Sequence, residues 1–120
     1  MTIVDVRAVL FDLDGTLLDT VPDLHAAVCS MLEELGRPAL LEEAIRCYVG
    51  RGIPNLVKRS LADSLDAAED DSPAPVEALA SFRRHYAREN GRRTQLFPGV
   101  IEGLQSIRSM GLQMAVITNK

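Results

Sequence analysis

The sequence lacks any apolar run close to the roughly 20 residues that a membrane-spanning helix needs, and no stretch has the anatomy of a signal peptide. Basic residues are in deficit as well, since 13 Lys and Arg stand against 17 Asp and Glu and the formal net charge is −4. Nucleic-acid binding needs clustered positive charge, which short pairs such as Arg83-Arg84 do not supply. We therefore expect a cytoplasmic protein with neither a membrane nor a nucleic-acid partner.

Cysteine is also scarce. The chain has two, Cys29 and Cys47, and both lie in segments with a helical pattern. A single pair in this setting does not indicate a secreted disulfide scaffold, and neither thiol has an electropositive loop around it, so we interpret both as reduced packing residues. The remaining composition, 47% hydrophobic and 25% charged in 120 residues, is typical of one globular domain or two small ones.

Two apolar segments rich in β-branched residues predict strands, which we expect to be buried in a parallel sheet. Between them, apolar residues recur at helical spacing in five segments, and the first of these helices should begin after Thr20 and stop at Gly36. An acidic loop separates the third and fourth helices. The expected strands are 4–11 and 114–118, and the helices contain 24–35, 41–49, 54–65, 76–86 and 100–107.

This order resembles a right-handed crossover unit that carries four extra helices after its first strand. We predict an α/β fold, namely the N-terminal part of a Rossmann-like parallel-sheet core with an inserted helical cap domain. Residues 1–17 and 93–120 would form an incomplete α/β core, and residues 18–92 would form the cap.

Four polar residues lie at the carboxyl ends of the two expected strands: Asp12, Asp14, Thr118 and Asn119. Ligands of open parallel sheets bind at these ends, so the four side chains should share one crevice. One ionised carboxylate can attack phosphorus, while the other can protonate the leaving oxygen and then activate water. The Thr118 hydroxyl and the Asn119 amide can donate hydrogen bonds to phosphate oxygens.

A plainer interpretation of the first strand end is a turn, because Asp-Gly is an ordinary turn dipeptide. Against it, a fixed pattern of two Asp, one Gly and one Thr should arise by chance in roughly one chain per thousand of this length. The buried strand expected just before the pattern lowers the odds further. We therefore favour a catalytic role for Asp12 and Asp14.

The segment Asp-Leu-Asp-Gly-Thr at 12–16, followed after a helical insertion by a strand ending in Thr118-Asn119, resembles the haloacid dehalogenase superfamily. Further segments, among them Val-Gly-Arg-Gly at 49–52 and Leu-Phe-Pro-Gly at 96–99, look most like bacterial phosphoglycolate phosphatases. The resemblance implies a magnesium-dependent phosphatase that hydrolyses a small organic phosphomonoester such as 2-phosphoglycolate through an aspartyl-phosphate.

By this resemblance Asp12 is the nucleophile and a magnesium ligand, and Asp14 is the acid/base and binds magnesium through its backbone carbonyl oxygen. Thr118 and Asn119, together with Gly15 and Thr16 of the motif, would bind phosphate.

Arg51, between two cap helices, is a candidate contact for a substrate carboxylate. A solvent-exposed loop arginine is its alternative.

Neighbouring branches of the superfamily fit less well. Dehalogenases usually have an aromatic residue at the position of Asp14, and β-phosphoglucomutases usually have a histidine at the position of Leu24. His25, one place later, is interpreted as a helix-surface residue. A sugar-phosphate phosphatase or phosphomutase, or a non-catalytic interaction module that keeps the fold, stay open as alternatives.

The family pattern also requires a catalytic lysine and a further acidic pair beyond the second strand, and we interpret Lys120 as neither. Two strands make little sheet to stand alone. We expect this chain to be a fragment with weak magnesium binding and little turnover, completed by self-association or by a polypeptide carrying the missing core half.

Overall fold

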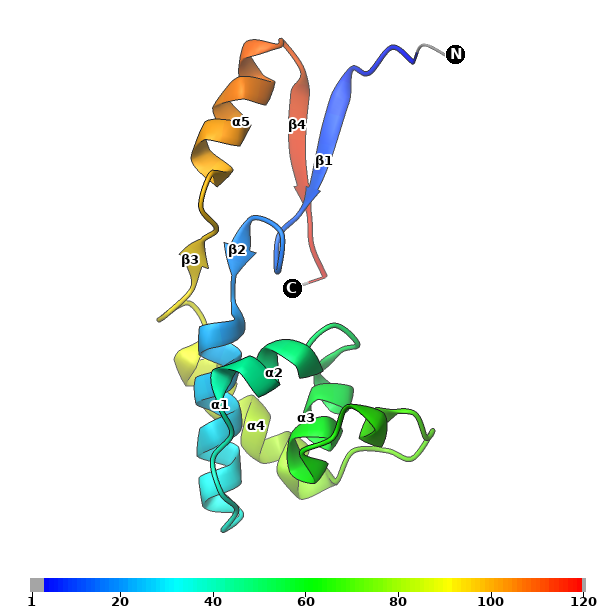
Figure 1. Cartoon of the computed structure of the whole chain (residues 1–120), viewed down its shortest axis with the longest axis vertical. Helices are drawn as coiled ribbons and strands as arrows, with labels where there is room; N and C mark the ends of the chain where they lie inside the picture. Colours follow the sequence, from blue (N-terminus) through cyan, green and yellow to red (C-terminus); the bar gives the residue numbers. More distant parts are fainter. Residues whose placement is uncertain (1–3, 120) are drawn as a thin grey trace. The chain divides into compact units, whose positions relative to one another are not determined.

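A computed structural model describes residues 4–119, which leaves Lys120 outside the described part. The chain divides into two compact units, one made of Met1–Asp19 with Gln95–Lys120 and the other of Thr20–Thr94. Both divisions lie two residues later than the predicted ones after residues 17 and 92. The mixed α/β fold with a parallel strand pair and an insertion of helices confirms the predicted fold class (Figure 1).

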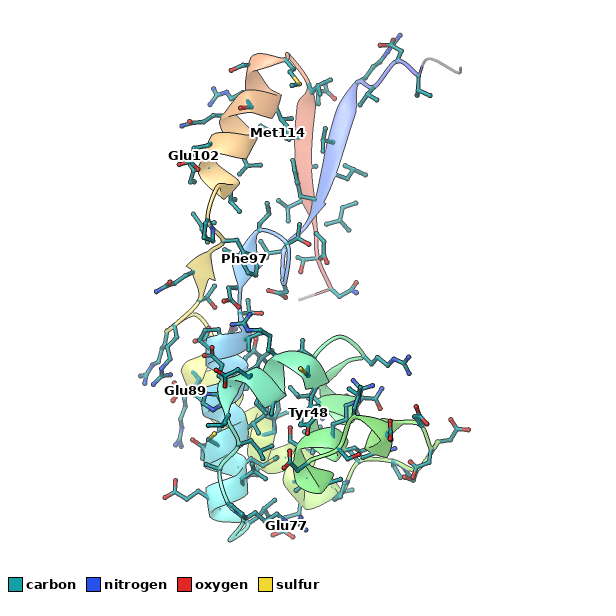
Figure 2. All side chains as sticks on the ribbon, viewed as in Figure 1. Tyr48, Glu77, Glu89, Phe97, Glu102 and Met114 are labelled. Carbon is teal, nitrogen blue, oxygen red and sulfur yellow. The ribbon has the colours of Figure 1, made fainter. Side chains whose placement is uncertain are left out.

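The first unit, here called the α/β unit, contains a parallel pair of strands, β1 (Ala8–Asp12) and β4 (Gln113–Ile117). Their register runs from Ala8 opposite Gln113 to Asp12 opposite Ile117, so both strands end at the same edge. Helix α5 (Val100–Ser109) precedes β4, and Glu102 projects from it on the side away from that strand (Figure 2).

A second pair of strands in this unit was not predicted. Strands β2 (Leu18–Asp19) and β3 (Gln95–Leu96) pair antiparallel, with Leu18 opposite Leu96 and Asp19 opposite Gln95. Each strand has only two residues, which is too short for the alternation of polar and apolar side chains that identifies strands in a sequence.

The expectation of buried strands was wrong for the described residues. Residues 4–7 precede β1 without strand structure, every residue of β4 is exposed, and Leu10 and Val116 keep 62% and 50% of their surface open. Parallel strands are normally covered on both faces by helices. Here each strand has one strand neighbour, and α5 contributes no buried residue.

The second unit contains helices and no strand among its described residues. It is here called the cap unit after the prediction above, and its role as a cap stays a prediction. It consists of α1 (Val21–Glu34), α2 (Glu42–Tyr48), α3 (Ile53–Ala62), the short 3₁₀ helix η1 (Leu65–Ala68) and α4 (Val76–Glu89). Apolar residues three and four positions apart form one face of each longer helix and pack together. The largest fully buried hydrophobic side chains are Val28, Met31, Leu32, Ile45, Val57 and Phe82.

The predicted end of the first cap helix was confirmed. Gly36 has φ of +69°, its N–H donates to Glu33 O at 3.0 Å, and the N–H of Arg37 donates to Leu32 O at 2.8 Å. This is the Schellman arrangement, in which a glycine takes the left-handed conformation that residues with a Cβ resist. Among residues 4–119 no helix is long and apolar enough to cross a membrane.

Candidate active site

The predicted convergence of polar residues at the strand ends is present for three of them. Asp12 is the last residue of β1 and lies opposite Ile117, the last residue of β4, so Thr118 and Asn119 follow at the same edge. A surface hollow is lined there by Leu10, Phe11, Asp12, Ile117, Thr118 and Asn119. One exposed carboxylate, a hydroxyl and an amide therefore border the same space.

The loop after β1 is tightly folded on itself. The Leu13 carbonyl accepts hydrogen bonds from the N–H groups of Leu17 and Leu18, both at 3.0 Å, and Gly15 N donates to Leu18 O at 2.8 Å. Gly15 has φ of +78°, a conformation that glycine adopts without the penalty a Cβ would bring. The Asp12 side chain is fixed as well, because its Oδ1 accepts from Leu13 N at 2.9 Å.

Asp14 has a different environment from Asp12. It forms a β-bridge with Leu18, it is half-buried where Asp12 is exposed, and its Oδ1 atom is buried. Asp14 is not among the residues that line the hollow, and neither are Gly15 and Thr16. The two carboxylates of the motif thus differ in access to solvent, which suits one exposed nucleophile and one more protected proton carrier.

The donor chemistry of this edge fits magnesium. The Asp12 carboxylate and the backbone carbonyl of Asp14 offer hard oxygen ligands, and Mg²⁺ in phosphate-handling sites is commonly held by one or two carboxylates with the substrate phosphate and waters completing its shell. Within residues 4–119 no three His, Cys, Asp or Glu side chains converge into a metal-binding group. These oxygen donors are compatible with magnesium, and a magnesium site at this edge stays a prediction.

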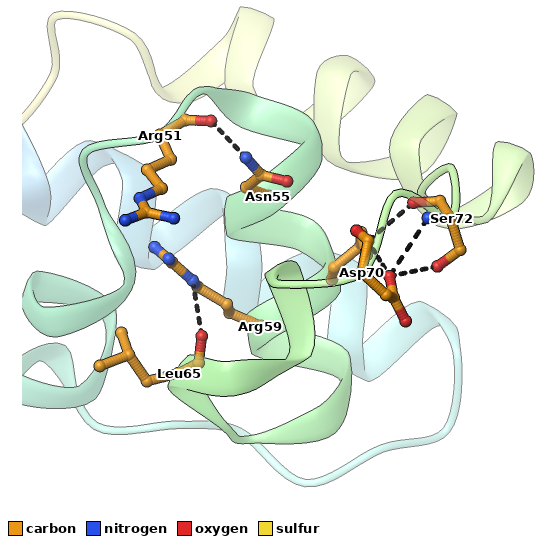
Figure 3. A network of polar contacts seen from close by, with 7 residues as sticks. Arg51, Asn55, Arg59, Leu65, Asp70 and Ser72 are labelled. Atoms are coloured by element: carbon orange, nitrogen blue, oxygen red, sulfur yellow. Dashed lines mark hydrogen bonds and ion pairs between the residues drawn. The ribbon is translucent and has the colours of Figure 1, made fainter.

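Arg51 belongs to the cap unit, in the loop between α2 and α3. Its side chain extends toward that of Arg59, and its carbonyl oxygen accepts a hydrogen bond from Asn55 Nδ2 at 2.8 Å (Figure 3). Arg59 is buried and donates to Tyr48 O at 2.9 Å and to Leu65 O at 3.0 Å. A role for Arg51 in substrate binding stays a prediction.

Asp23 is the polar residue that the sequence reasoning missed. It lies in the first turn of α1 and is fully buried, where it accepts hydrogen bonds from Gly91 N at 2.9 Å, Arg93 N at 2.6 Å and Thr94 Oγ1 at 2.5 Å. Burial opposes ionisation, but the three hydrogen bonds and the charge of Arg93 outweigh it, so the pKa of Asp23 is lowered.

His25 is not the surface residue that we expected. It is half-buried, and its Nε2 lies 2.7 Å from Leu40 O and 3.3 Å from Cys29 Sγ. One turn of α1 brings His25 and Cys29 onto the same side, where the segment after α1 covers them. His85, for which the sequence offered no partner, lies 2.9 Å from Glu34 Oε2.

The family of the chain follows from its match to known sequences. The model of the haloacid dehalogenase-like hydrolases matches residues 9–120, which include both strand ends and the whole cap unit. The chain belongs to this family of haloacid dehalogenase-like hydrolases.

Within the family, the chain is similar to proteins named phosphoglycolate phosphatase. It is 48% identical to one from Thiobacillus denitrificans over 96% of this chain and 50% of that protein, and 51% identical to one from Pseudomonas putida over 95% and 42%. The chain spans about half the length of the curated relatives it matches.

A solved structure agrees with the fold. The crystal structure of a Lactobacillus delbrueckii subsp. bulgaricus protein, provisionally assigned as a phosphoglycolate phosphatase, superposes with a TM-score of 0.80 at 29% identity. The match covers 98% of this chain and 56% of that one.

Proposed function

We propose that the protein to which these residues belong is a magnesium-dependent phosphatase that hydrolyses a small organic phosphomonoester, with 2-phosphoglycolate as the first candidate. The observation that carries the proposal is the shared hollow bordered by Asp12, Thr118 and Asn119 at the ends of two paired parallel strands. Membership of the hydrolase family and the names of the relatives support it. The cytoplasmic location expected from the sequence belongs to the same proposal.

In the proposed reaction, a carboxylate oxygen of Asp12 attacks the phosphorus atom and the bond from phosphorus to the ester oxygen breaks. Asp14 donates a proton to the departing oxygen, so the alcohol leaves neutral and Asp12 carries the phosphoryl group. A water molecule then attacks phosphorus while Asp14 takes its proton. The bond between Asp12 and phosphorus breaks, which releases inorganic phosphate and restores the free carboxylate.

Phosphate binding is assigned to the donors around the hollow. The Thr118 hydroxyl and the Asn119 amide would hold two phosphate oxygens, with the loop at Gly15 and Thr16 beside them. Magnesium, held by oxygens of Asp12 and Asp14, would neutralise the repulsion between the nucleophile and the phosphate. Arg51 would recognise the substrate carboxylate from the cap unit.

Phosphate release from a panel of esters by the full-length protein tests this proposal. We expect magnesium-dependent hydrolysis with the highest kcat/KM on 2-phosphoglycolate, and little activity in Asp12→Asn. A preference for hexose phosphates would favour a sugar-phosphate phosphatase or phosphomutase instead. Absence of turnover on every ester, with magnesium present, would favour a non-catalytic interaction module.

The role of Arg51 has a separate test. Arg51→Ala should raise KM for 2-phosphoglycolate and leave KM for a phosphomonoester without a carboxylate nearly unchanged, because only the first substrate has a charge to pair. Unchanged kinetics on both substrates would remove Arg51 from the site. Arg83→Ala, at an exposed arginine of α4, is the matched control.

A further inference from the structure

The chain passes between its two units twice, at residues 19–20 and at residues 94–95. On the side of the α/β unit, strands β2 and β3 hold the two passages together, since Leu18 pairs with Leu96 and Asp19 with Gln95. Phe97 N adds a hydrogen bond to Leu17 O at 3.2 Å. A ladder of two residues on each strand is marginal by itself.

On the side of the cap unit, one carboxylate joins the two passages. Asp23 is the fourth residue of the cap unit, and its partners Gly91, Arg93 and Thr94 are among the last four residues of that unit. Oδ2 accepts from Gly91 N and Thr94 Oγ1, and Oδ1 accepts from Arg93 N. Both oxygens are thus engaged by the returning segment.

Because Asp23 is buried, the loss of these hydrogen bonds would be energetically costly. The residue is 0% exposed, and a buried carboxylate is costly unless hydrogen bonds replace its water. Bonds from N–H and O–H groups to an ionised carboxylate are roughly twice as strong as bonds between neutral groups. The lowered pKa of Asp23 agrees with a carboxylate that the returning segment stabilises. If residues 91–94 separated from α1, this charge would lose all three of its recorded donors.

We propose that Asp23 is a clamp that fastens the two chain passages together on the cap side, so that a single two-stranded hinge carries the cap unit. Together with the pairing of β2 and β3, the clamp makes the two chain passages of the hinge move together. Without these contacts, the two passages would move independently of each other. The inference rests on contacts inside each unit and does not depend on the proposed phosphatase reaction, so either can fail without the other.

Amide hydrogen exchange measured by NMR on the full-length protein tests the clamp. In Asp23→Asn the side-chain NH₂ group replaces one acceptor oxygen and faces an N–H or O–H donor. We expect exchange at Gly91 and Arg93 to accelerate about tenfold or more, since hydrogen bonds to charged groups are the strong ones. Exchange at Ile45 and Phe82 in the cap core should stay within about twofold. Glu77→Gln, at an exposed residue of α4, is the matched control and should change none of these rates.

A second variant keeps the test meaningful if Asp23→Asn does not fold. Thr94→Val keeps the shape of the side chain and removes only the hydroxyl that donates to Asp23 Oδ2. We expect a smaller acceleration, about threefold to tenfold, at the same two amides. Unchanged exchange at Gly91 and Arg93 in this variant would overturn the clamp.

The hinge itself is tested by the spread of distances between the units. Nitroxide labels on the exposed Cys47 and on Gln105→Cys, in a Cys29→Ser background, report that spread by pulsed electron spin resonance. We expect a broader distance distribution in Asp23→Asn than in Glu77→Gln. The cooperative thermal unfolding of the helices, followed by circular dichroism, should be retained in both variants. Equal distributions in the two proteins would contradict the single hinge.

Discussion

The cap unit and the α/β unit differ in where they bury apolar side chains. In the cap unit, residues from α1, α2, α3 and α4 form one closed core, and Val28, Ile45, Val57 and Phe82 are all 0% exposed. In the α/β unit, no residue of α5 or β4 is buried, although β4 is almost entirely apolar. The candidate catalytic residues Asp12 and Asp14 lie in the α/β unit, and the well-packed core lies in the cap unit.

The two units therefore differ in what they contribute: the cap unit contributes packed apolar side chains, and the α/β unit contributes the candidate catalytic groups. The stability of the cap unit comes from packing, because in a close-packed interior the loss of a buried side chain lowers the free energy of unfolding. In the proposed function, the α/β unit would contribute the chemistry through a few polar groups, whose backbone positions are fixed by strand pairing and by the loop after β1. Substitutions in the two units should therefore affect different measurements.

The largest expected effect is on activity and comes from Asp12→Asn in the full-length protein. An amide in place of the carboxylate cannot form the proposed phosphoryl intermediate, so kcat should fall about a thousandfold or more. The urea midpoint should stay nearly unchanged, because Asp12 is exposed. Phosphate release and urea denaturation check the two halves of this prediction. Residual activity within tenfold of the wild type would contradict the assignment.

The next largest effect is on stability and comes from Phe82→Ala. Phe82 is 0% exposed and stacks on Tyr86 with ring centroids 5.6 Å apart, so its truncation should destabilise the cap unit by about 3–5 kcal/mol.

Leu10→Ala on β1 is the matched control, and it should cost less than about 1 kcal/mol in the described chain because Leu10 is 62% exposed. Urea denaturation followed by circular dichroism measures both variants. Equal costs would remove the distinction between the two units.

A smaller effect should follow from Gly36→Ala at the end of α1. No atom lies within 4 Å of the position that a new Cβ would take, so the cost comes only from the left-handed conformation at φ of +69°. We expect about 1 kcal/mol of destabilisation, measured from the urea midpoint. A neutral or stabilising result would show that the helix ends differently in solution.

The smallest effect concerns acid. The hydrogen bond from Lys58 to Asp70, at 2.5 Å, together with bonds from Ser72, lowers the pKa of Asp70 from 3.8 to about 2. Because the folded pKa is the lower one, the stability that this carboxylate contributes is present above about pH 4 and is lost as the pH falls toward 2.

Asp70→Asn should therefore reduce the fall in the urea midpoint between pH 5 and pH 2. A fall will remain, because the pKa values of Asp23 and Glu34 are lowered as well. An unchanged fall in the variant would show that the contact between Lys58 and Asp70 is open in solution.

Features that depend on neighbouring residues in the sequence were easier to predict than features that depend on residues far along the chain. The convergence of Asp12, Thr118 and Asn119 was predictable, because parallel strands end at the same edge and an apolar run before each residue identified its strand. The end of α1 at Gly36 was predictable because helix termination is local.

Other features depend on partners far along the chain. In the sequence, Asp23 has the pattern of an ordinary acidic residue in the first turn of a helix. Its hydrogen-bond partners Gly91, Arg93 and Thr94 lie 68 to 71 residues later in the chain and come close to it only after folding. The exposure of β4 holds for the described residues of a chain that spans about half the length of its relatives. It was not predictable, because an apolar strand has the same sequence whether or not other elements cover it.

The most direct test of the central claim is to trap the phosphoryl group on the protein. Full-length protein mixed with ³²P-labelled 2-phosphoglycolate and magnesium, quenched in acid within the first turnover and digested, should carry the label on the peptide that contains Asp12. Asp12→Asn should carry none. Label on a peptide without Asp12, or turnover in the first cycle with no labelled protein at any quench time, would contradict the proposal that Asp12 is the nucleophile.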